Sequence, residues 1–260
     1  MLLALDVGNT NVTVGAFEGE RLRDQWRHET RCFSAPALLS AARKRRVRVT
    51  AAIYGSVVPE LGGEVRKALR SFGVPSVGIG PRSALGMRLL VERPGQVGAD
   101  RILNAVAAAE LYGAPAVVVD FGTATTFDCI SGRGDYLGGA ILPGPNMAAQ
   151  ALAEKTAKLP LVQVRRPRRV IGRETVECIE AGLYYGYLGM IEKVLTLTKQ
   201  ELRQSGETGR VRAIATGGLS ALFLRDLRGF IHAPDLTLQG LRLSYERLRR
   251  RGAAARGSFQ

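Results

Sequence analysis

The 260-residue sequence has few of the residues that build metal clusters, disulfide frameworks or membrane spans. Its three cysteines, Cys32, Cys129 and Cys178, are far apart and odd in number, so we expect no disulfide framework or zinc cluster, and a reducing cytoplasmic location. The two histidines, His28 and His232, lie near no other potential ligand, which argues against histidine metal sites and Ser-His-Asp catalysis. No apolar run approaches the roughly 18 residues of a membrane helix. The N-terminus also lacks the basic region of a signal peptide.

Negative charge is also scarce, because 37 Lys and Arg face 23 Asp and Glu, giving a net charge of +14. The basic clusters at Arg43–Arg46, Arg165–Arg166 with Arg168–Arg169, and Arg249–Arg251 are scattered and not interleaved with aromatic residues. We therefore expect solvent-exposed faces that attract anionic substrates, with neither a nucleic acid nor a membrane as a partner. A polyanion site remains the alternative interpretation of this charge.

Apolar segments alternate with helical patterns along the chain, which is typical of an α/β fold. Residues 2–7 and 11–17 are expected to form two strands joined by a hairpin turn. The remaining expected strands are 51–57, 74–79, 116–119, 125–130, 136–141 and 211–215. The expected helices are 34–46, 61–72, 99–112, 146–157 and 174–204, with Ser34 capping the first. Three glycines in the last helix, at 182, 186 and 189, suggest a close helix contact or a break.

An internal repeat is the most informative feature of the sequence. The segment Leu2–Thr10 is an apolar strand followed by Asp, any residue, Gly and small polar residues. The same pattern recurs in Val117–Thr125, where Asp120 lies 114 residues after Asp6. Two copies at half-chain spacing predict two similar lobes that face one cleft. We expect an N-terminal lobe over residues 1–115, a C-terminal lobe over 116–250 and a disordered tail over 251–260.

The first copy has the composition of a phosphate-binding turn. Gly8 lets backbone N–H groups approach a phosphate, and Asn9, Thr10 and Asn11 add side-chain donors. Asp6 is itself an anion, so its expected task is to hold a hydrated Mg²⁺ that bridges the phosphates. The alternative is an ordinary hairpin turn satisfied by Asp and Asn.

The second copy, Asp120–Thr126, offers hydroxyl groups in place of amides, and the presence of both copies favours phosphate binding. The segment Thr216–Ser220 follows a strand, and its paired glycines suit an adenine lying against the backbone. As a lone motif it also fits a common turn before a helix. The sequence contains neither a Walker loop nor a dinucleotide-binding glycine motif.

Two helix starts carry candidate substrate residues. Asp100 and Arg101 lie in the first turn of the helix expected from residue 99, where the helix dipole favours a carboxylate and lowers its pKa. Asp100 is a candidate proton acceptor and Arg101 a candidate ligand for a substrate anion, the alternative being simple capping. At the other start, Thr175 either caps the helix or binds substrate through its hydroxyl.

Taken together, these motifs resemble those of the type III pantothenate kinases, also described as Bvg accessory factor-like proteins, over residues 1–248. The resemblance also rests on the segments Gly138–Pro145, Gly172–Gly182 and Leu236–Leu241. It implies two duplicated ribonuclease H-like lobes, the actin-like ATPase fold of the acetate and sugar kinase, Hsp70 and actin superfamily. The implied activity is transfer of the γ-phosphate of ATP to pantothenate, the first step of coenzyme A synthesis.

The resemblance also implies a role for each matching residue. Asp100 would be the catalytic proton acceptor, and Asp120 the ligand of a monovalent cation, K⁺ or ammonium. A homodimer is implied, with the helix after residue 174 as the candidate interface. The implied ATP and phosphate residues are Asp6, Val7, Gly8, Asn9, Thr10, Asn11, Val12, Thr13 and Thr123, with Mg²⁺ organised by Asp6. The implied substrate residues are Gly98, Ala99, Asp100, Arg101 and Thr175.

One position departs from the family pattern. Many relatives have an aromatic or polar substrate-contacting residue where this sequence has Val91, so that contact is absent or made by backbone. Two alternatives to the main interpretation remain. The first is a nucleic-acid-binding or regulatory accessory protein on the same fold, and the second is a kinase of another small hydroxylated substrate.

Overall fold

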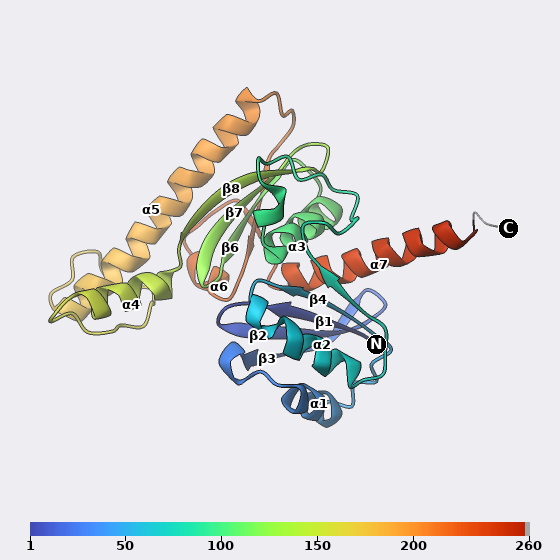
Figure 1. Ribbon diagram of the computed structural model, residues 1–260. Coiled ribbons are helices and arrows are strands. Elements are labelled where there is room, and N and C mark those ends of the chain that lie inside the picture. The colour runs from blue at the N-terminus through green and yellow to red at the C-terminus, as the bar shows by residue number, and fades with distance from the viewer. Residues whose placement is uncertain (258–260) are drawn as a thin grey trace. The chain divides into compact units, whose positions relative to one another are not determined.

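The computed structural model describes the backbone of residues 1–257 and the side chains of residues 1–251. The chain divides into two compact units, each built around its own five-stranded sheet. The first unit consists of residues 1–110 and helix α7 (Leu236–Gly257), and the second consists of residues 111–235 (Figure 1).

The sheet of the first unit has the strand order β3-β2-β1-β4-β5. Its strands are β1 (Leu2–Val7), β2 (Asn11–Glu18), β3 (Arg21–Glu29), β4 (Ala51–Ser56) and β5 (Ser76–Ile79). The central strand β1 pairs antiparallel with β2, which places Asp6 opposite Thr13, and parallel with β4, which places Asp6 beside Gly55. The predicted hairpin is thus confirmed.

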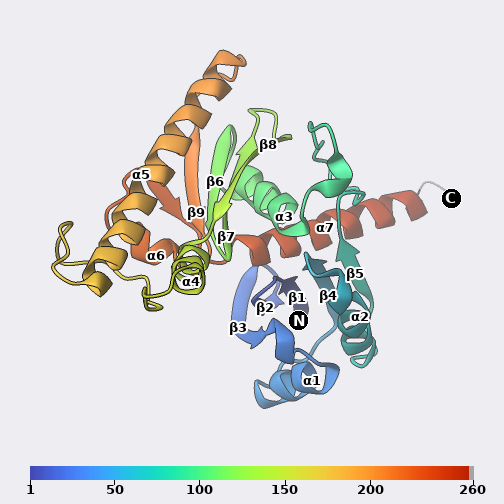
Figure 2. The same cartoon turned by 60° about the vertical axis from the view of Figure 1, so that its left-hand side comes forward.

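Helices cover both faces of this sheet. Helices α1 (Ala35–Lys44) and α2 (Gly62–Arg70) pack against Leu3, Leu5 and Val7 of β1 in the core of the unit. The predicted cap of α1 is confirmed, because Ser34 Oγ accepts a hydrogen bond from the N–H of Ala37 at 3.4 Å. Helix α3 (Ala99–Ala107) and helix α7 contact β4 on the other face (Figure 2). Because side chains alternate along a strand, Asp6 is on the face of α3 and α7.

The second unit repeats this sheet. Its strands are β6 (Ala116–Phe121), β7 (Ala124–Ile130), β8 (Tyr136–Pro143), β9 (Arg212–Thr216) and β10 (Phe230–His232). The order β10-β9-β6-β7-β8 has β6 antiparallel to β7 and parallel to β9, as β1 is to β2 and β4. The predicted α/β fold with two duplicated ribonuclease H-like lobes is therefore confirmed.

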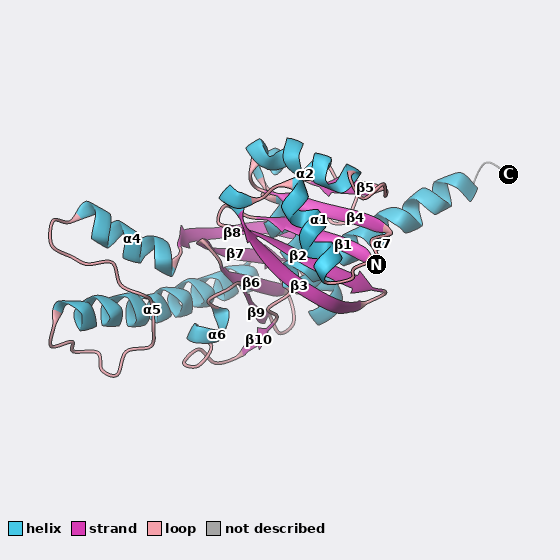
Figure 3. Cartoon of the chain, turned by 90° about the horizontal axis from the view of Figure 1, so that it is seen from below, coloured by secondary structure: helices cyan, strands magenta, loops and turns pink. Residues whose placement is uncertain are grey.

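Three helices belong to the second unit: α4 (Pro145–Lys155), α5 (Thr175–Gln204) and α6 (Ser220–Phe223). Its core joins Val117, Val119 and Phe121 of β6 to Tyr184 and Phe223 from these helices. Helices α4 and α5 lie next to each other, and the segment that joins them, residues 156–174, contains no helix or strand (Figure 3). Asp120 alternates with the core residues of β6, so it is on the opposite face of the sheet.

The C-terminal part of the chain differs from the prediction. Residues from 236 onward were expected in the second lobe, but α7 packs on α3 and β1 in the first unit. Its Gly240 lies directly against the backbone of Leu103. A tail was expected from residue 251, whereas α7 continues to Gly257; residues 258–260 lie outside the described part of the chain. Within the described residues, no helix combines the length and apolar character that crossing a membrane requires.

Candidate functional site

The first phosphate turn is held in shape by Thr30, the residue that directly follows β3. The Thr30 hydroxyl donates a hydrogen bond to the Gly8 carbonyl oxygen at 2.6 Å, and its N–H donates to the Thr10 carbonyl oxygen at 3.0 Å. Within the turn, the Gly8 N–H donates to the Asn11 carbonyl oxygen at 3.0 Å. The turn therefore has a fixed backbone, which suits a site that presents N–H groups to an anion.

The predicted residues of this turn differ in what they can present. Asn9 and Thr10 are exposed, and Asp6, Gly8, Asn11 and Thr13 are half-buried. The side chains of Val7 and Val12 are completely buried in the core of the unit. Those two valines can therefore contribute only their backbone groups to a ligand.

The segment Gly98–Arg101 begins α3 beside the same turn. The connection is Val57, whose N–H donates to the Val7 carbonyl oxygen at 3.0 Å. A Cβ added to Gly98 would lie 3.4 Å from a methyl carbon of Val57 and would overlap the Asp100 carboxylate. Asp6 and Asp100 are thus brought to one edge and one face of the first sheet.

Burial controls the acidity of Asp100. Loss of water raises the pKa of this carboxyl above its usual value, and this effect exceeds the opposing hydrogen bond and positive charge of Arg101. The Arg101 N–H donates to Asp100 Oδ1 at 2.8 Å. The expectation of a lowered pKa at this helix N-terminus was therefore wrong. A raised pKa makes the ionised carboxylate a stronger proton acceptor.

The second phosphate turn is held by close backbone packing. A Cβ added to Gly144, which directly follows β8, would overlap the Thr123 carbonyl oxygen and lie 2.7 Å from that of Gly122. A Cβ added to Gly217 would overlap the Asp120 carboxylate and lie 2.6 Å from the backbone of Phe121. The predicted adenosine segment Thr216–Ser220 therefore lies directly against Asp120, while Thr123 is exposed.

Thr175 lies at a different place in the second unit. It borders a cavity of about 620 Å³ between α4 and α5 that is lined by Leu152, Leu159, Gly172–Thr175, Cys178, Ile179, Gly182 and Leu183. Thr175 is the first residue of α5 and Glu174 is its N-cap, so the capping role considered for Thr175 was wrong. Glu177 instead accepts a hydrogen bond from the Arg173 N–H at 2.9 Å. Thr175 is exposed at the border of this cavity.

Each turn, taken by itself, suits a cation that is held mainly by phosphate oxygens. Among the described residues, no three His, Cys, Asp or Glu side chains gather into a metal-binding group. Mg²⁺ is commonly bound through one or two carboxylates and the phosphates of a nucleotide, with waters completing its shell. A single aspartate at each turn, Asp6 and Asp120, fits that requirement.

Sequence reasoning missed the residues that support the turns. Thr30 and Val57 act through contacts with residues distant in the chain, and their own neighbourhoods contain no motif. Gly144 lies within Gly138–Pro145, a segment that carried the family resemblance, but no role was assigned to it. The available signal for Gly144 was its place directly after a strand, because glycine there often marks a close approach of another backbone segment.

Comparisons with known proteins agree with this geometry. The family model of type III pantothenate kinases matches residues 2–196. The type III pantothenate kinase of Myxococcus xanthus is 45% identical over 258 residues, covering 95% of this chain and 98% of the relative. That of Moorella thermoacetica is 43% identical over 257 residues, covering 95% and 99%. Both alignments span nearly the complete length of each protein.

A solved structure supports the fold independently. The crystal structure of a protein described as a Baf family transcriptional activator from Campylobacter jejuni matches with a TM-score of 0.58 and 17% identity, covering 95% of this chain and 99% of that chain. The duplicated lobes, each with an aspartate and a glycine turn at the end of its first strand, have the actin-like fold that the sequence predicted. The chain belongs to the type III pantothenate kinase family.

Proposed function

We propose that this chain transfers the γ-phosphoryl group of ATP to the primary hydroxyl of pantothenate. The product is 4′-phosphopantothenate, and the reaction is the first step of coenzyme A synthesis. The observation that carries the proposal is the 45% identity to a type III pantothenate kinase over 95% of the chain. The presence of Asp6, Asp100 and Asp120 at the turns and helix start that the reaction requires supports it further.

Asp100 is the proposed proton acceptor. Phosphoryl transfer passes through a loose transition state, so the protein contributes mainly positioning and charge neutralisation, and the attacking hydroxyl loses its proton late. Burial raises the pKa of Asp100, which strengthens it as a base once ionised. Gly98, Ala99 and Arg101 surround this carboxylate at the start of α3, and Arg101 offers a forked cation to the carboxylate of pantothenate.

The nucleotide is proposed to bind at the two turns. In the first, the backbone of residues 7–13 and the side chains of Asn9, Thr10 and Asn11 would contact the phosphates, and Asp6 would help to hold Mg²⁺. In the second, Thr123 contacts ATP, and Asp120 binds a monovalent cation, K⁺ or ammonium. When bound, these cations neutralise charge on the phosphates. Thr175, at the cavity between α4 and α5, is the proposed pantothenate contact in the second unit.

A cytoplasmic homodimer is part of this proposal, with α5 as the interface. Gly182, Gly186 and Gly189 are exposed along one side of this helix. Among the described residues, apart from sequence neighbours and the helix's own backbone, no atom lies within 4 Å of a Cβ added to any of them. Met190 and Leu197 are 40% and 48% exposed on the same helix. A second copy of the helix could approach such a surface closely.

The activity is tested by ADP release from ATP and Mg²⁺, with and without pantothenate, in K⁺ and in Na⁺ buffer. We expect turnover that needs pantothenate and is faster in K⁺. Asp100→Asn should lower kcat by roughly 10²- to 10⁴-fold, the usual contribution of a general base. Folded protein that releases no ADP with pantothenate under either cation would refute the proposal.

The raised pKa of Asp100 gives this variant a second signature. Because the folded state binds the Asp100 proton more tightly than the unfolded state does, the ionised carboxylate at neutral pH opposes folding. Asp100→Asn removes that ionisation, so its thermal midpoint at neutral pH should equal or exceed that of the wild type. In the wild type, kcat/KM should decrease as the pH is lowered, and the midpoint of this decrease should lie above pH 3.8, the ordinary pKa of this group. A marked loss of stability in Asp100→Asn would show that its inactivity has a structural cause.

A further inference from the structure

The segment 156–174 between α4 and α5 ends at the cavity that Thr175 borders, and it has no helix or strand of its own. Its position depends on a few side chains. Val162 and Val164 are buried in the core of the second unit, and Arg165 pairs with the buried Glu180 of α5 at 2.8 Å. The next residue, Arg166, reaches a different part of the unit.

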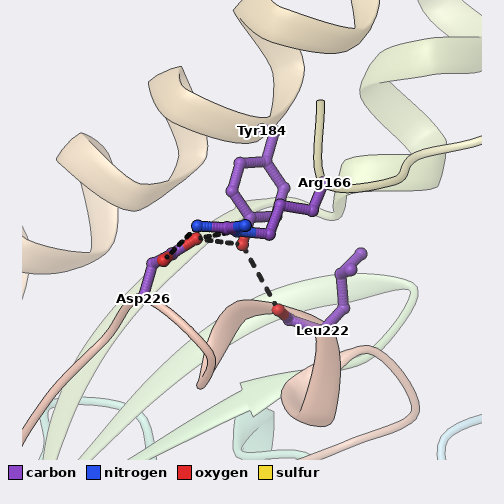
Figure 4. Close-up of polar contacts among 4 residues, drawn as sticks. All are labelled: Arg166, Tyr184, Leu222 and Asp226. Carbon is purple, nitrogen blue, oxygen red and sulfur yellow. Dashed lines mark hydrogen bonds and ion pairs between the residues drawn. The ribbon is translucent and has the colours of Figure 1, made fainter. Parts of the chain in front are cut away.

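Arg166 forms a bidentate ion pair with Asp226 (Figure 4). Its Nε donates to Asp226 Oδ2 at 2.7 Å, and its Nη2 donates to Oδ1 at 3.0 Å. The Tyr184 hydroxyl donates to Asp226 Oδ2 at 2.7 Å and lies 3.4 Å from the Leu222 carbonyl oxygen. Burial and the neighbouring Asp226 raise the pKa of Tyr184 to about 12, so this hydroxyl remains a donor at neutral pH.

Stability alone is a poor reason for this arrangement. The side chains of Arg166 and Asp226 are 51% and 26% exposed, and exposed ion pairs contribute little to folding because water and salt screen them. A paired guanidinium and carboxylate do, however, fix the relative position of the two segments that carry them, since both planar groups must align. The contact is therefore better suited to positioning than to stabilisation.

The two segments it joins belong to different parts of the proposed site. Asp226 follows α6, which begins at Ser220, the last residue of the adenosine segment. Phe223 of α6 is fully buried and stacks on Tyr184 at 5.3 Å and on Phe121 at 5.5 Å. Phe121 directly follows Asp120 in the second phosphate turn. A continuous set of contacts thus runs from that turn through α6 to Arg166.

We propose that Arg166 is a positioning residue that couples the nucleotide segment Thr216–Ser220 to the pantothenate end of segment 156–174. Nucleotide bound against Thr216–Ser220 fixes α6 and Asp226, and Asp226 then holds Arg166 and the segment that leads to Thr175. Pantothenate consequently binds more tightly to the nucleotide complex than to the free protein. Linkage requires the same factor for nucleotide binding in the presence of pantothenate. This inference rests on the proposed function.

The first test measures steady-state kinetics of Arg166→Gln and Asp226→Asn. Each should raise KM for pantothenate about fivefold or more and change kcat less than about twofold, since coupling energies of this size are typical. The double variant should be no worse than either single variant, because both remove the same contact. Arg168→Gln is the matched control: it removes one positive charge from an exposed position of the same segment. An unchanged KM for pantothenate in Arg166→Gln would overturn the proposal.

Tyr184→Phe separates positioning from folding. It keeps the ring stacked on Phe223 and removes only the hydroxyl that donates to Asp226. It should raise KM for pantothenate by a smaller factor than Arg166→Gln, at an unchanged thermal midpoint. If Arg166→Gln fails to fold, this variant decides alone, and a KM equal to that of the wild type would then overturn the proposal.

A second test needs no pantothenate and so distinguishes failure of this inference from failure of the proposed function. Trypsin cleavage after Arg168 or Arg169 reports on segment 156–174. Mg²⁺ and ADP should slow that cleavage about fivefold in the wild type and in Arg168→Gln, by the same coupling, but not in Arg166→Gln. Equal protection by ADP in wild type and Arg166→Gln would refute the coupling, whatever substrate the enzyme uses.

Discussion

The two phosphate turns occupy equivalent places in two sheets of the same strand order, but different residues hold them. Each unit begins with three antiparallel strands, β1–β3 in the first unit and β6–β8 in the second, and the residue that directly follows the third strand lies against the turn. In the first unit this residue is Thr30, whose hydroxyl and N–H both donate to turn carbonyl oxygens. In the second it is Gly144, which has no side chain and packs directly on the backbone of Thr123.

The difference shows that a duplicated fold can keep the same turn geometry through different interactions: side-chain hydrogen bonding in one unit and close backbone packing in the other. The first turn depends on a particular side chain, so a small change of hydroxyl to methyl should loosen it. The second depends on the absence of a side chain, so the smallest addition should displace it. The two turns should therefore respond to substitution in different ways and to different extents.

The largest effect is expected from Gly144→Ala. The added methyl group would overlap the Thr123 carbonyl oxygen, and neither backbone can move without displacing the turn. We expect a loss of about 1–3 kcal/mol in the free energy of unfolding, as for other overpacked sites, and a higher KM for ATP. Thermal denaturation and steady-state kinetics measure the two effects.

Gly63→Ala is the control for this change. In the described part of the chain, no atom beyond its sequence neighbours and the backbone of α2 lies within 4 Å of a Cβ added there. It should leave KM for ATP close to that of the wild type and, through helix propensity, raise the free energy of unfolding by at most about 0.5–1 kcal/mol. Equal behaviour of Gly144→Ala and Gly63→Ala would show that the second turn does not depend on close packing.

A smaller effect is expected from Thr30→Val. This change keeps the shape of the side chain and the N–H bond to Thr10, but it removes the 2.6 Å hydrogen bond to Gly8. Such a bond contributes about 0.5–1.5 kcal/mol, so KM for ATP should rise about 2- to 10-fold, with little change in KM for pantothenate. Thr30→Ser restores the hydroxyl and should restore most of the affinity. If valine and serine give the same KM, the hydroxyl does not hold the turn.

The hairpins and most helices were predictable because their signals are local. Apolar strands ending in aspartate, turns rich in glycine and the Ser34 cap are all visible in short windows. Strand β3 was missed because its sequence, Arg21–Glu29, is mostly polar and lacks an apolar alternation; it forms through pairing with β2. The C-terminal lobe predicted over residues 116–250 wrongly included most of α7. This helix belongs to the first unit because it packs against α3, which short sequence windows do not reveal.

The residues of the candidate site likewise fall into those with a local sequence signal and those that depend on tertiary contacts. Asp6 and Asp120 could be chosen as candidates because each lies near the end of an apolar strand and two residues before a glycine, and Asp100 because it lies in the first turn of a helix; their roles stay predictions. The pKa of Asp100 was not predictable, since its sign depends on burial outweighing the helix N-terminus. The positions of Thr30, Gly144 and Arg166 against their partners also required the tertiary structure, because those partners are remote in sequence.

The smallest effect on the chain itself is expected from Gly186→Ala, which sharpens the contrast between crowded and open glycines within one unit. Gly144 is crowded by backbone, whereas a Cβ added to Gly186 meets none of the described residues within 4 Å apart from its sequence neighbours and the backbone of α5. Alanine should therefore stabilise α5 by about 0.5–1 kcal/mol through its helix propensity. If α5 is the interface of a homodimer, the same methyl groups separate the two helices, so the dimer dissociation constant rises while the thermal midpoint of the monomer does not fall. Sedimentation equilibrium measures the first quantity, with Gly63→Ala as the reference for an open glycine away from α5. A dimer of unchanged affinity would place the interface on another surface.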